Sequence, residues 1–405
     1  MKILFALPFI ALIIIIATIN VRLFLGPPSS PPEDRLLKQL RSLKSDIENG
    51  ADVKMQRLYP EGYVFLNTLY GLAWCNYLRF SKTDDTGYEE AHSEISSALE
   101  RVQSPSAHSH FNKYLFPEYG AFYSGWSNYL LGQKLEIEPK EKRNPIEIAS
   151  YEATCDSIAK AVSMKTFPLS YGGGAWPADV VVCMASLAKH DKLFEQKYQS
   201  IIREWITQVK ERVDSTGLIP HKVMPGSGKS VESSRGSSQS LMLIFLKEID
   251  KDFALEQYEI FKTHFVDTTL GLTGIREYMR GQIGFGDVDS GPVVLGYGAA
   301  STIVGSATLA MYGDVNAGRL SALIEAFALP IENDSHRYHL LGFLPIVDAF
   351  IVWGQSLNLE NAPVSASFPV FHLCSALVLA CLIAFVWILI KPSKPDSARA
   401  LTIPW

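Results

Sequence analysis

Long apolar runs at the two ends of the chain limit its fold more than any other feature. Residues Ile3–Ile19 and Val370–Ile390 are apolar almost without interruption. Each run is long enough to cross the hydrocarbon core of a bilayer as a helix. The first run ends without the small-x-small pattern of a cleavage site, which favours an uncleaved signal anchor over a cleaved signal peptide. We therefore expect a body that is held to a membrane at both ends.

The charges beside these runs predict a two-pass orientation with both termini in the cytoplasm. Lys2 precedes the first run, and Lys391, Lys394 and Arg399 follow the second. Cations favour the cytoplasmic side, although Arg22 lies just past the first run on the opposite side. The predicted organisation is a signal anchor at 1–25, a Pro-rich linker at 26–34, an extracytoplasmic domain at 35–365, a transmembrane helix at 369–391 and a cytoplasmic tail at 392–405.

The composition excludes several classes of protein. The 405 residues carry a net charge of -5 without a basic stripe, which argues against a nucleic-acid partner. Hydrophobic residues make up 47% of the chain, so the body can bury a large core. The five cysteines form no C-x-x-C pair or His/Cys cluster with zinc spacing. We expect buried thiols, with one disulfide as the alternative, and no metal or cofactor; nothing indicates an oligomeric state.

Between the two runs the sequence predicts eleven or twelve helices and few strands. Helical hairpins in this number commonly close into a double ring, so the predicted fold class is all-α, an (α/α)6 barrel flanked by two transmembrane helices. Residues 293–311 carry no charge and are typical of an inner helix, with a third membrane span as the alternative. The expected helices cover 35–49, 62–80, 88–102, 119–132, 146–164, 178–190, 197–213, 238–247, 254–265, 293–312, 317–327 and 346–357.

A glycine-rich acidic turn, Gly284–Pro292, is the most prominent candidate site. Asp287 and Asp289 lie two residues apart, so they can face one side of an extended segment. Such a pair could divide general acid and base roles, while the alternative is that Asp289 or Ser290 only caps the following helix. Glu277 and Tyr278 lie just upstream and are predicted to add a catalytic carboxylate and a substrate-binding hydroxyl.

A second candidate site is the loop Ser170–Asp179, in which three glycines are flanked by aromatic residues. Tyr171 and Trp176 are typical of walls that bind sugars, prenyl chains or cations. Asp179 is predicted as a second catalytic carboxylate across the cavity. The alternative is that it only complements the dipole of the helix it begins.

Four further residues are predicted to bind substrate. His221 can exchange a proton near neutral pH, although a histidine in a loop is more often a structural hydrogen-bonding group. Arg235 follows in the next loop. Tyr63 and Tyr123 lie in two similar loops, each with a Glu between Pro and aromatic residues at a helix start. Simple aromatic packing is the alternative for these two loops.

Taken together, these blocks resemble a family of membrane-anchored bacterial proteins related to linalool dehydratase-isomerase. The resemblance rests on segments spread over much of the body, and it implies the helical toroid and acid–base chemistry without a metal. The characterised enzyme adds or removes water at a tertiary allylic alcohol and also uses two nearby cysteines, whereas Cys155 and Cys183 are not closely spaced here. The resembling segments are Tyr59–Tyr63, Tyr119–Trp126, Ala175–Asp179, Gly217–His221, Arg235–Ser238 and Gly286–Pro292.

The function that we expect first is that of a lyase or isomerase acting on a small, largely apolar alcohol. Two carboxylates held apart in an apolar pocket can have separated pKa values, so that one donates and the other accepts a proton. A glycan-active hydrolase on the same toroid is the second hypothesis, and a non-catalytic binding or envelope protein is the third. The expected partner is therefore a small-molecule or glycan substrate.

Overall fold

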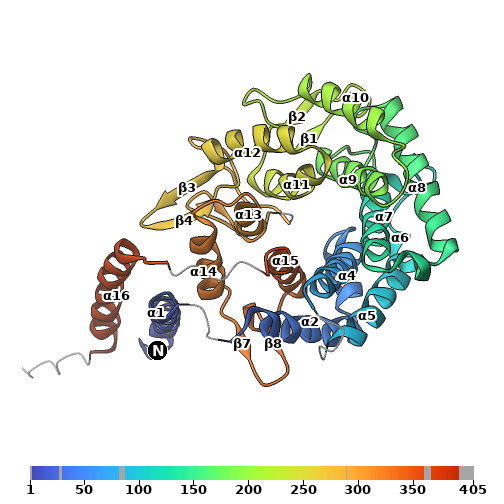
Figure 1. The fold of residues 1–405 in the computed structure, drawn as a ribbon. Coiled ribbons are helices and arrows are strands. Elements are labelled where there is room, and N and C mark those ends of the chain that lie inside the picture. The colour runs from blue at the N-terminus through green and yellow to red at the C-terminus, as the bar shows by residue number, and fades with distance from the viewer. Residues whose placement is uncertain (1, 27–29, 82–86, 289, 360–365, 392–405) are drawn as a thin grey trace, which may run out of the picture.

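The computed structural model describes residues 2–26, 30–81, 87–288, 290–359 and 366–391. Six of its helices form a closed inner ring (Figure 1). Each of the six packs against the next, and the last contacts the first. They are α4 (Gly62–Phe80), α7 (Gly120–Ile137), α9 (Pro177–Leu193), α11 (Gly236–Ile249), α13 (Ala299–Met311) and α15 (Pro345–Ser356).

Six outer helices surround this ring, and each precedes an inner helix in the sequence. The chain thus forms six helical hairpins, which confirms the predicted all-α (α/α)6 barrel. The outer helices bury one apolar stripe each, as α2 does through Leu36, Leu40, Leu43 and Ile47. They are α2 (Pro32–Glu48), α5 (Tyr88–Val102), α8 (Pro145–Met164), α10 (Gln199–Lys210), α12 (Lys251–Phe265) and α14 (Ala317–Phe327).

The interior of the ring is filled by aromatic side chains from four inner helices. Trp126 of α7 lies 5.1 Å from Phe65 of α4 and 5.4 Å from Phe245 of α11, between ring centroids. Trp353 of α15 lies 5.9 Å from Phe245 and 6.3 Å from Trp126. Offset and edge-to-face pairs of this kind add to the stabilisation from buried area. The barrel is therefore a packed core and not an open channel at this level.

The connections at the two ends of the barrel differ in length. Apart from the 3-10 turn η1 (Lys140–Lys142), which joins α7 to α8, the added short elements lie where an outer helix leads into an inner one; we call this end the rim. The opposite connections are short, for example the single residue between α11 and α12. The rim elements are α3 (Ala51–Leu58), α6 (Pro105–His108), the 3-10 turn η2 (Leu340–Gly342) and the hairpins β1–β2 (Lys222–Val223, Ser230–Glu232), β3–β4 (Val266–Thr269, Leu272–Ile275), β5–β6 (Val293–Val294, Tyr297–Gly298) and β7–β8 (Ile331–Glu332, Arg337–Tyr338).

Several predicted helix boundaries were wrong by three or more residues, and two of them bear on the architecture. Residues 293–298 form the hairpin β5–β6, so the helix expected from 293 begins only at Ala299. It lies in the ring and is too short for a third span. Helix α2 begins at Pro32, inside the predicted linker, because proline fits the first turn of a helix, where its missing N–H costs nothing.

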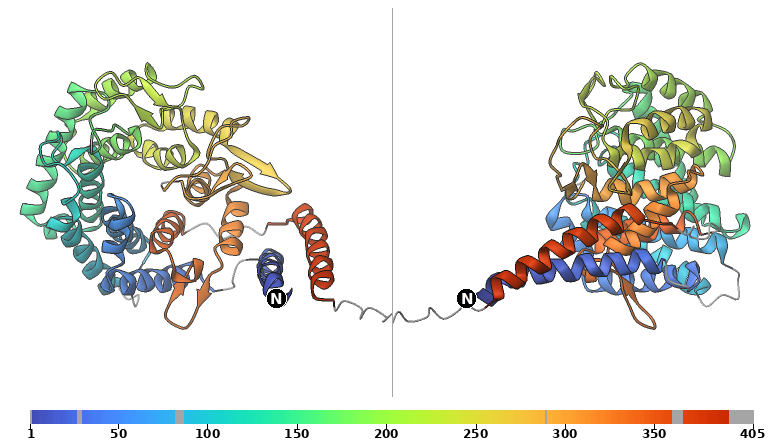
Figure 2. Two further views of the ribbon diagram at one scale, coloured as in Figure 1. Left: turned by 180° about the vertical axis from the view of Figure 1, so that it is seen from behind. Right: turned by 90° about the vertical axis from the view of Figure 1, so that its left-hand side faces the viewer.

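The two terminal helices are long and apolar enough to cross a membrane: α1 (Lys2–Leu25) and α16 (Pro369–Ile390). They pack against each other beside the barrel (Figure 2). Asn20 of α1 accepts a hydrogen bond from Ser375 of α16 at 2.8 Å. All five cysteines are free thiols, and Cys75, Cys155 and Cys183 are buried, as expected from the sequence.

Candidate functional site at the rim

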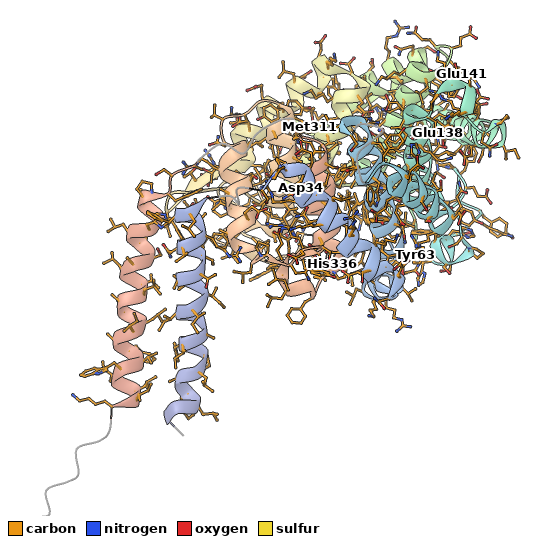
Figure 3. All side chains as sticks on the ribbon, turned by 60° about the horizontal axis from the view of Figure 1, so that its bottom comes forward. Asp34, Tyr63, Glu138, Glu141, Met311 and His336 are labelled. Atoms are coloured by element: carbon orange, nitrogen blue, oxygen red, sulfur yellow. The ribbon has the colours of Figure 1, made fainter. Side chains whose placement is uncertain are left out.

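The rim gathers the amino-terminal ends of the six inner helices. Every inner helix is reached from an antiparallel outer helix, so the inner helices run parallel. In Figure 3, Tyr63 near the start of α4 lies on the opposite side of the barrel from Glu138 and Met311, which mark the ends of α7 and α13. The amino-terminal ends of helices carry partial positive charge, which favours carboxylates at this end of the barrel.

Arg235, the residue before α11, is the centre of a charged cluster at the rim. Its Nη1 lies 2.7 Å from Oδ2 of Asp287, and its Nε lies 3.0 Å from Oε1 of Glu277. The second contact has the distance of an ion pair without the angle of a hydrogen bond. Nη2 donates to the hydroxyl of Tyr278 at 3.2 Å. Glu277, Tyr278 and Asp287 therefore all contact the guanidinium of Arg235. All three are predicted site residues, and they lie 42 or more positions further along the chain.

Glu277 is completely buried, and residues of the first turn of α11 hold it in place. Ser237 donates to Oε1 from its hydroxyl at 2.7 Å, and the amide of Gly236 donates to the backbone oxygen of Glu277 at 2.9 Å. A Cβ at position 236 would lie 1.8 Å from the carbonyl oxygen of Arg276, so only glycine allows this approach. Glu277 therefore supports the cluster and does not face a substrate.

The two carboxylates of the cluster are shifted in opposite directions. Burial raises the pKa of Glu277 and outweighs the hydrogen bonds from Ser237 and the attraction of Arg235. For Asp287, burial alone would also raise the pKa, but the hydrogen bonds from Arg235 and Ser290 prevail and lower it to about 2. The Asp287 side chain is 47% exposed. It is the carboxylate that is ionised and reachable by a ligand.

His221 joins the cluster from the loop before β1. Its Nε2 lies 3.3 Å from Nη1 of Arg235, and its Nδ1 makes a close hydrogen bond with the hydroxyl of Ser238. Arginine only donates, so Nε2 must accept and the ring proton lies on Nδ1, pointing at Ser238. This tautomer cannot take a proton from Ser238, which excludes a Ser–His nucleophile here. Burial, followed by the charge of Arg235, lowers the pKa of His221 to about 3.

Two expectations for the acidic turn have different outcomes. Asp289 lies outside the described residues. The Ser290 side chain does not cap α13, which has no side-chain cap at its start. The amide of Ser290 instead donates to Oδ1 of Asp287 at 2.9 Å. The amide of Asp287 in turn donates to the hydroxyl oxygen of Ser290 at the same distance. These two hydrogen bonds orient the Asp287 side chain so that its other oxygen, Oδ2, faces Arg235.

The other four predicted aromatic residues lie at the rim and have contacts of their own. Tyr171 and Trp176 stack with ring centroids 4.9 Å apart, and the Lys222 ammonium lies over Trp176. Tyr123 turns towards α5, because its hydroxyl donates to the carbonyl of Val102. Tyr63 is buried, which raises its pKa. These contacts are those of side-chain packing at the rim.

Asp179 is buried in the first turn of α9, where the sequence places it at the rim. Its position agrees with a carboxylate near a helix amino terminus. It belongs to the sector of Tyr171 and Trp176, and its role as a second catalytic acid stays a prediction.

A buried His–Asp pair at the rim was missed from the sequence. His339 donates its backbone amide to Oδ1 of Asp348 at 2.8 Å, and its Nδ1 lies at the same distance from that oxygen. Burial, then repulsion by Asp348, raises the pKa of nearby Asp46 to about 6. The only sign of this pair in the sequence was an acidic residue, Asp348, in the first helical turn after Pro345. Both members of the pair are buried, so they join α15 to the loop before it.

No group of three or more metal-ligating side chains occurs in the described part of the chain. Two cavities are found away from Arg235. One of about 520 Å³ lies between the end of α10 and the β1–β2 hairpin, beside Asp214 and Ser233. Another of about 240 Å³ separates α1 from α14. Neither is lined by the residues of the charged cluster.

The fold and site define an (α/α)6 toroid with an arginine–carboxylate cluster at its rim. No protein-family model and no curated protein matches the chain. Two solved structures are similar over 73% of this chain and 86% of theirs, each with a TM-score of 0.41. One is an unsaturated glucuronyl hydrolase responsible for glycosaminoglycan degradation, from Bacillus sp. GL1, at 10% identity. The other is a UGL variant with dGlcA-Glc-Rha-Glc, at 11% identity. Likeness at this level carries no argument about activity.

Proposed function

We propose that the chain is a membrane-tethered acid–base enzyme of the lyase or isomerase type, acting on a small and largely apolar alcohol. Asp287 is the reacting carboxylate of this proposal. The observation that carries it is one half-exposed, ionised acid fixed by Arg235 at the mouth of a barrel filled with aromatic side chains. In this proposal α1 and α16 are the tether, the barrel lies outside the cytoplasm and both termini lie inside; the length and apolar composition of the two helices support it.

Burial of Glu277 favours this function over glycoside hydrolysis. A glycosidase of the usual kind needs two carboxyl groups that both reach the sugar, about 5–9.5 Å apart. Glu277 is fully buried and shares the guanidinium of Arg235 with Asp287. It cannot contact a sugar ring. A second acid for a hydrolase would have to come from elsewhere, with Asp179 as the remaining predicted carboxylate.

In an elimination, Asp287 would take a proton from the carbon next to the one that bears the hydroxyl. The electron pair of that C–H bond becomes the C=C bond, and the C–O bond breaks. The hydroxyl takes a proton from solvent on the exposed side of Asp287 and leaves as water. Hydration is the reverse. Arg235 keeps Asp287 ionised and oriented, so its carboxylate can accept a proton. A carboxylate with a pKa of about 2 is a weak base, so the C–O bond would break first and leave a cation whose neighbouring C–H is acidic enough for Asp287.

Solvent oxygen exchange tests this proposal without knowledge of the product. The full chain in phospholipid vesicles is incubated in ¹⁸O-labelled water with a set of tertiary and allylic alcohols, and mass spectrometry follows the label. We expect ¹⁸O in one alcohol, and a loss of about 10²-fold or more in Asp287→Asn at an almost unchanged melting temperature. Asp334→Asn, an exposed acid on the β7–β8 hairpin, is the matched control. Equal exchange by both variants would overturn the role of Asp287, and release of reducing sugar from oligosaccharides would favour the hydrolase.

A further inference from the structure

Large apolar side chains are exposed on the rim in unusual number. In the loop between β4 and α13, the exposed fractions are 96% for Ile283, 91% for Phe285 and 67% for Val288. Val294 and Leu295, at the β5–β6 turn, are also about two-thirds exposed. A soluble surface rarely presents such a cluster, and contiguous exposed apolar patches mark sites of protein or membrane contact.

Large apolar side chains are also exposed in the other connections of the rim. Leu58 of α3, Tyr114 before α7 and Phe343 before α15 are exposed by 60%, 83% and 82%. Among the described residues outside α1 and α16, only four large exposed apolar side chains lie in or beside the connections at the opposite end: Phe80, Ile146, Leu255 and Val315. The barrel therefore has one apolar end and one polar end.

The outer end of α1 is fixed to the rim side of the barrel. Ile19 and Leu23 pack against Leu323 and Ala326, in the last two turns of α14. Nη2 of Arg22 donates to the carbonyl oxygen of Pro330, in the connection that leaves α14 at the rim. The preceding part of α1 therefore continues beyond the rim.

The outer end of α16 is fixed at the same level. Arg319 donates to the carbonyl oxygens of Ser367, just before α16, and of Gly271, at the β3–β4 turn. A Cβ at Gly271 would touch Val370, so this rim hairpin meets the first turn of α16 directly. The side view in Figure 2 and the labelled residues in Figure 3 agree: α1 and α16 run away from the barrel on the rim side.

We propose that the apolar rim lies in the outer interface of the bilayer that α1 and α16 cross, so that the site around Asp287 opens towards lipid. Arg22 lies near the end of the span, where a long cationic side chain can reach the interface. Apolar side chains on loops bury there by the same hydrophobic gain that holds interfacial helices. Asp287 is flanked by Phe285 and Val288, so its loop is part of the contact.

What this inference implies about the substrate rests on the proposed function. A site that opens into the interface takes a substrate dissolved in the membrane, with an isoprenoid-like apolar body in lipid and its hydroxyl near the headgroups. A water-soluble oligosaccharide would have no path to it. The membrane contact itself does not depend on which reaction Asp287 performs.

Spin-label accessibility tests the contact in the full chain. Cys374 and Cys381 are first replaced by alanine, while the three buried thiols stay. A nitroxide is then placed by Phe285→Cys or, as the matched control, by Val315→Cys, which is equally exposed at the polar end. In vesicles of phosphatidylethanolamine and phosphatidylglycerol, collisions with oxygen report lipid, and collisions with a neutral water-soluble nickel chelate report water.

We expect the oxygen-to-nickel collision ratio to be several-fold higher at 285 than at 315. Equal, water-like ratios at both positions would overturn the inference, because Phe285 would then face solvent or another protein. Both side chains are surface residues, so the substitutions should leave the melting temperature unchanged. If the label at 285 lies in lipid but Asp287→Asn keeps full exchange activity, the proposed function fails and the membrane contact stands.

Discussion

Arg235 shows how one side chain can determine the state of several others. Its guanidinium contacts Glu277, Asp287, Tyr278 and His221 within 3.3 Å. Burial opposes its charge, but the hydrogen bond to Asp287 and the attraction of Glu277 prevail, so its pKa lies above its usual value. The same charge helps to keep Asp287 ionised and His221 neutral. Lysine could not replace it, because the contacts need the planar fork of donors.

At the residue scale, His221 should make the protein less stable in acid. Its pKa is about 3 when folded and about 6.5 when unfolded. As pH falls below 6.5 only the unfolded chain takes up the proton, so stability present above pH 6.5 is lost on the way down to about pH 3. His221→Gln should reduce the slope of unfolding free energy against pH in this window by at most ~1.4 kcal/mol per pH unit.

Denaturant unfolding of the full chain in detergent at several pH values measures this slope. His110→Gln is the control, because His110 is exposed and its hydrogen bond is to its neighbour Ser109. An identical slope for wild type and His221→Gln would show that His221 is solvated and outside the cluster.

At the element scale, four inner helices depend on one shared aromatic cluster. Trp126 is completely buried where α4, α7, α11 and α15 meet, so Trp126→Ala should cost about 3–5 kcal/mol of unfolding free energy. Ile146→Ala, at a position 78% exposed on α8, should change it by less than about 0.5 kcal/mol. Both values come from denaturant unfolding in detergent. If Trp126→Ala lowers the unfolding free energy by no more than Ile146→Ala does, the interior of the ring is loosely packed.

The sequence predicted the elements better than it predicted the site. Helical periodicity and the uncharged inner segments were sufficient for the toroid, because inner helices are apolar on every face. The hairpin β5–β6 was missed, since its short strands have no alternating pattern to read. The cluster of His221, Arg235, Glu277 and Asp287 was named residue by residue, but its centre on Arg235 was not foreseen.

Other features of the site could not be predicted because they depend on which loops meet. Tyr123 and Tyr171 had the composition of a binding wall, but the contacts of their polar and ring groups are with residues of their own hairpins. The His339–Asp348 pair gave no periodic signal. Burial of Glu277 follows from the close approach of Gly236 to the backbone of residue 276, which a sequence pattern does not encode.

At the scale of the whole molecule, the account requires that loops distant in sequence meet at one rim. The contact between Arg235, ahead of α11, and Glu277, ahead of α13, joins two neighbouring hairpins at the rim. Arg235→Met alone leaves the buried carboxylate without its cation, which costs about 3–5 kcal/mol. Removing the charge with Glu277→Gln in the same chain should recover part of that cost.

A double-mutant cycle with Arg235→Met, Glu277→Gln and the double variant measures this contact directly, by denaturant unfolding of the full chain in detergent. We predict a coupling of about 1–3 kcal/mol, with the double variant more stable than Arg235→Met alone. Effects that add to within about 0.5 kcal/mol would show that these loops do not meet, and would contradict both the site and the function proposed for it.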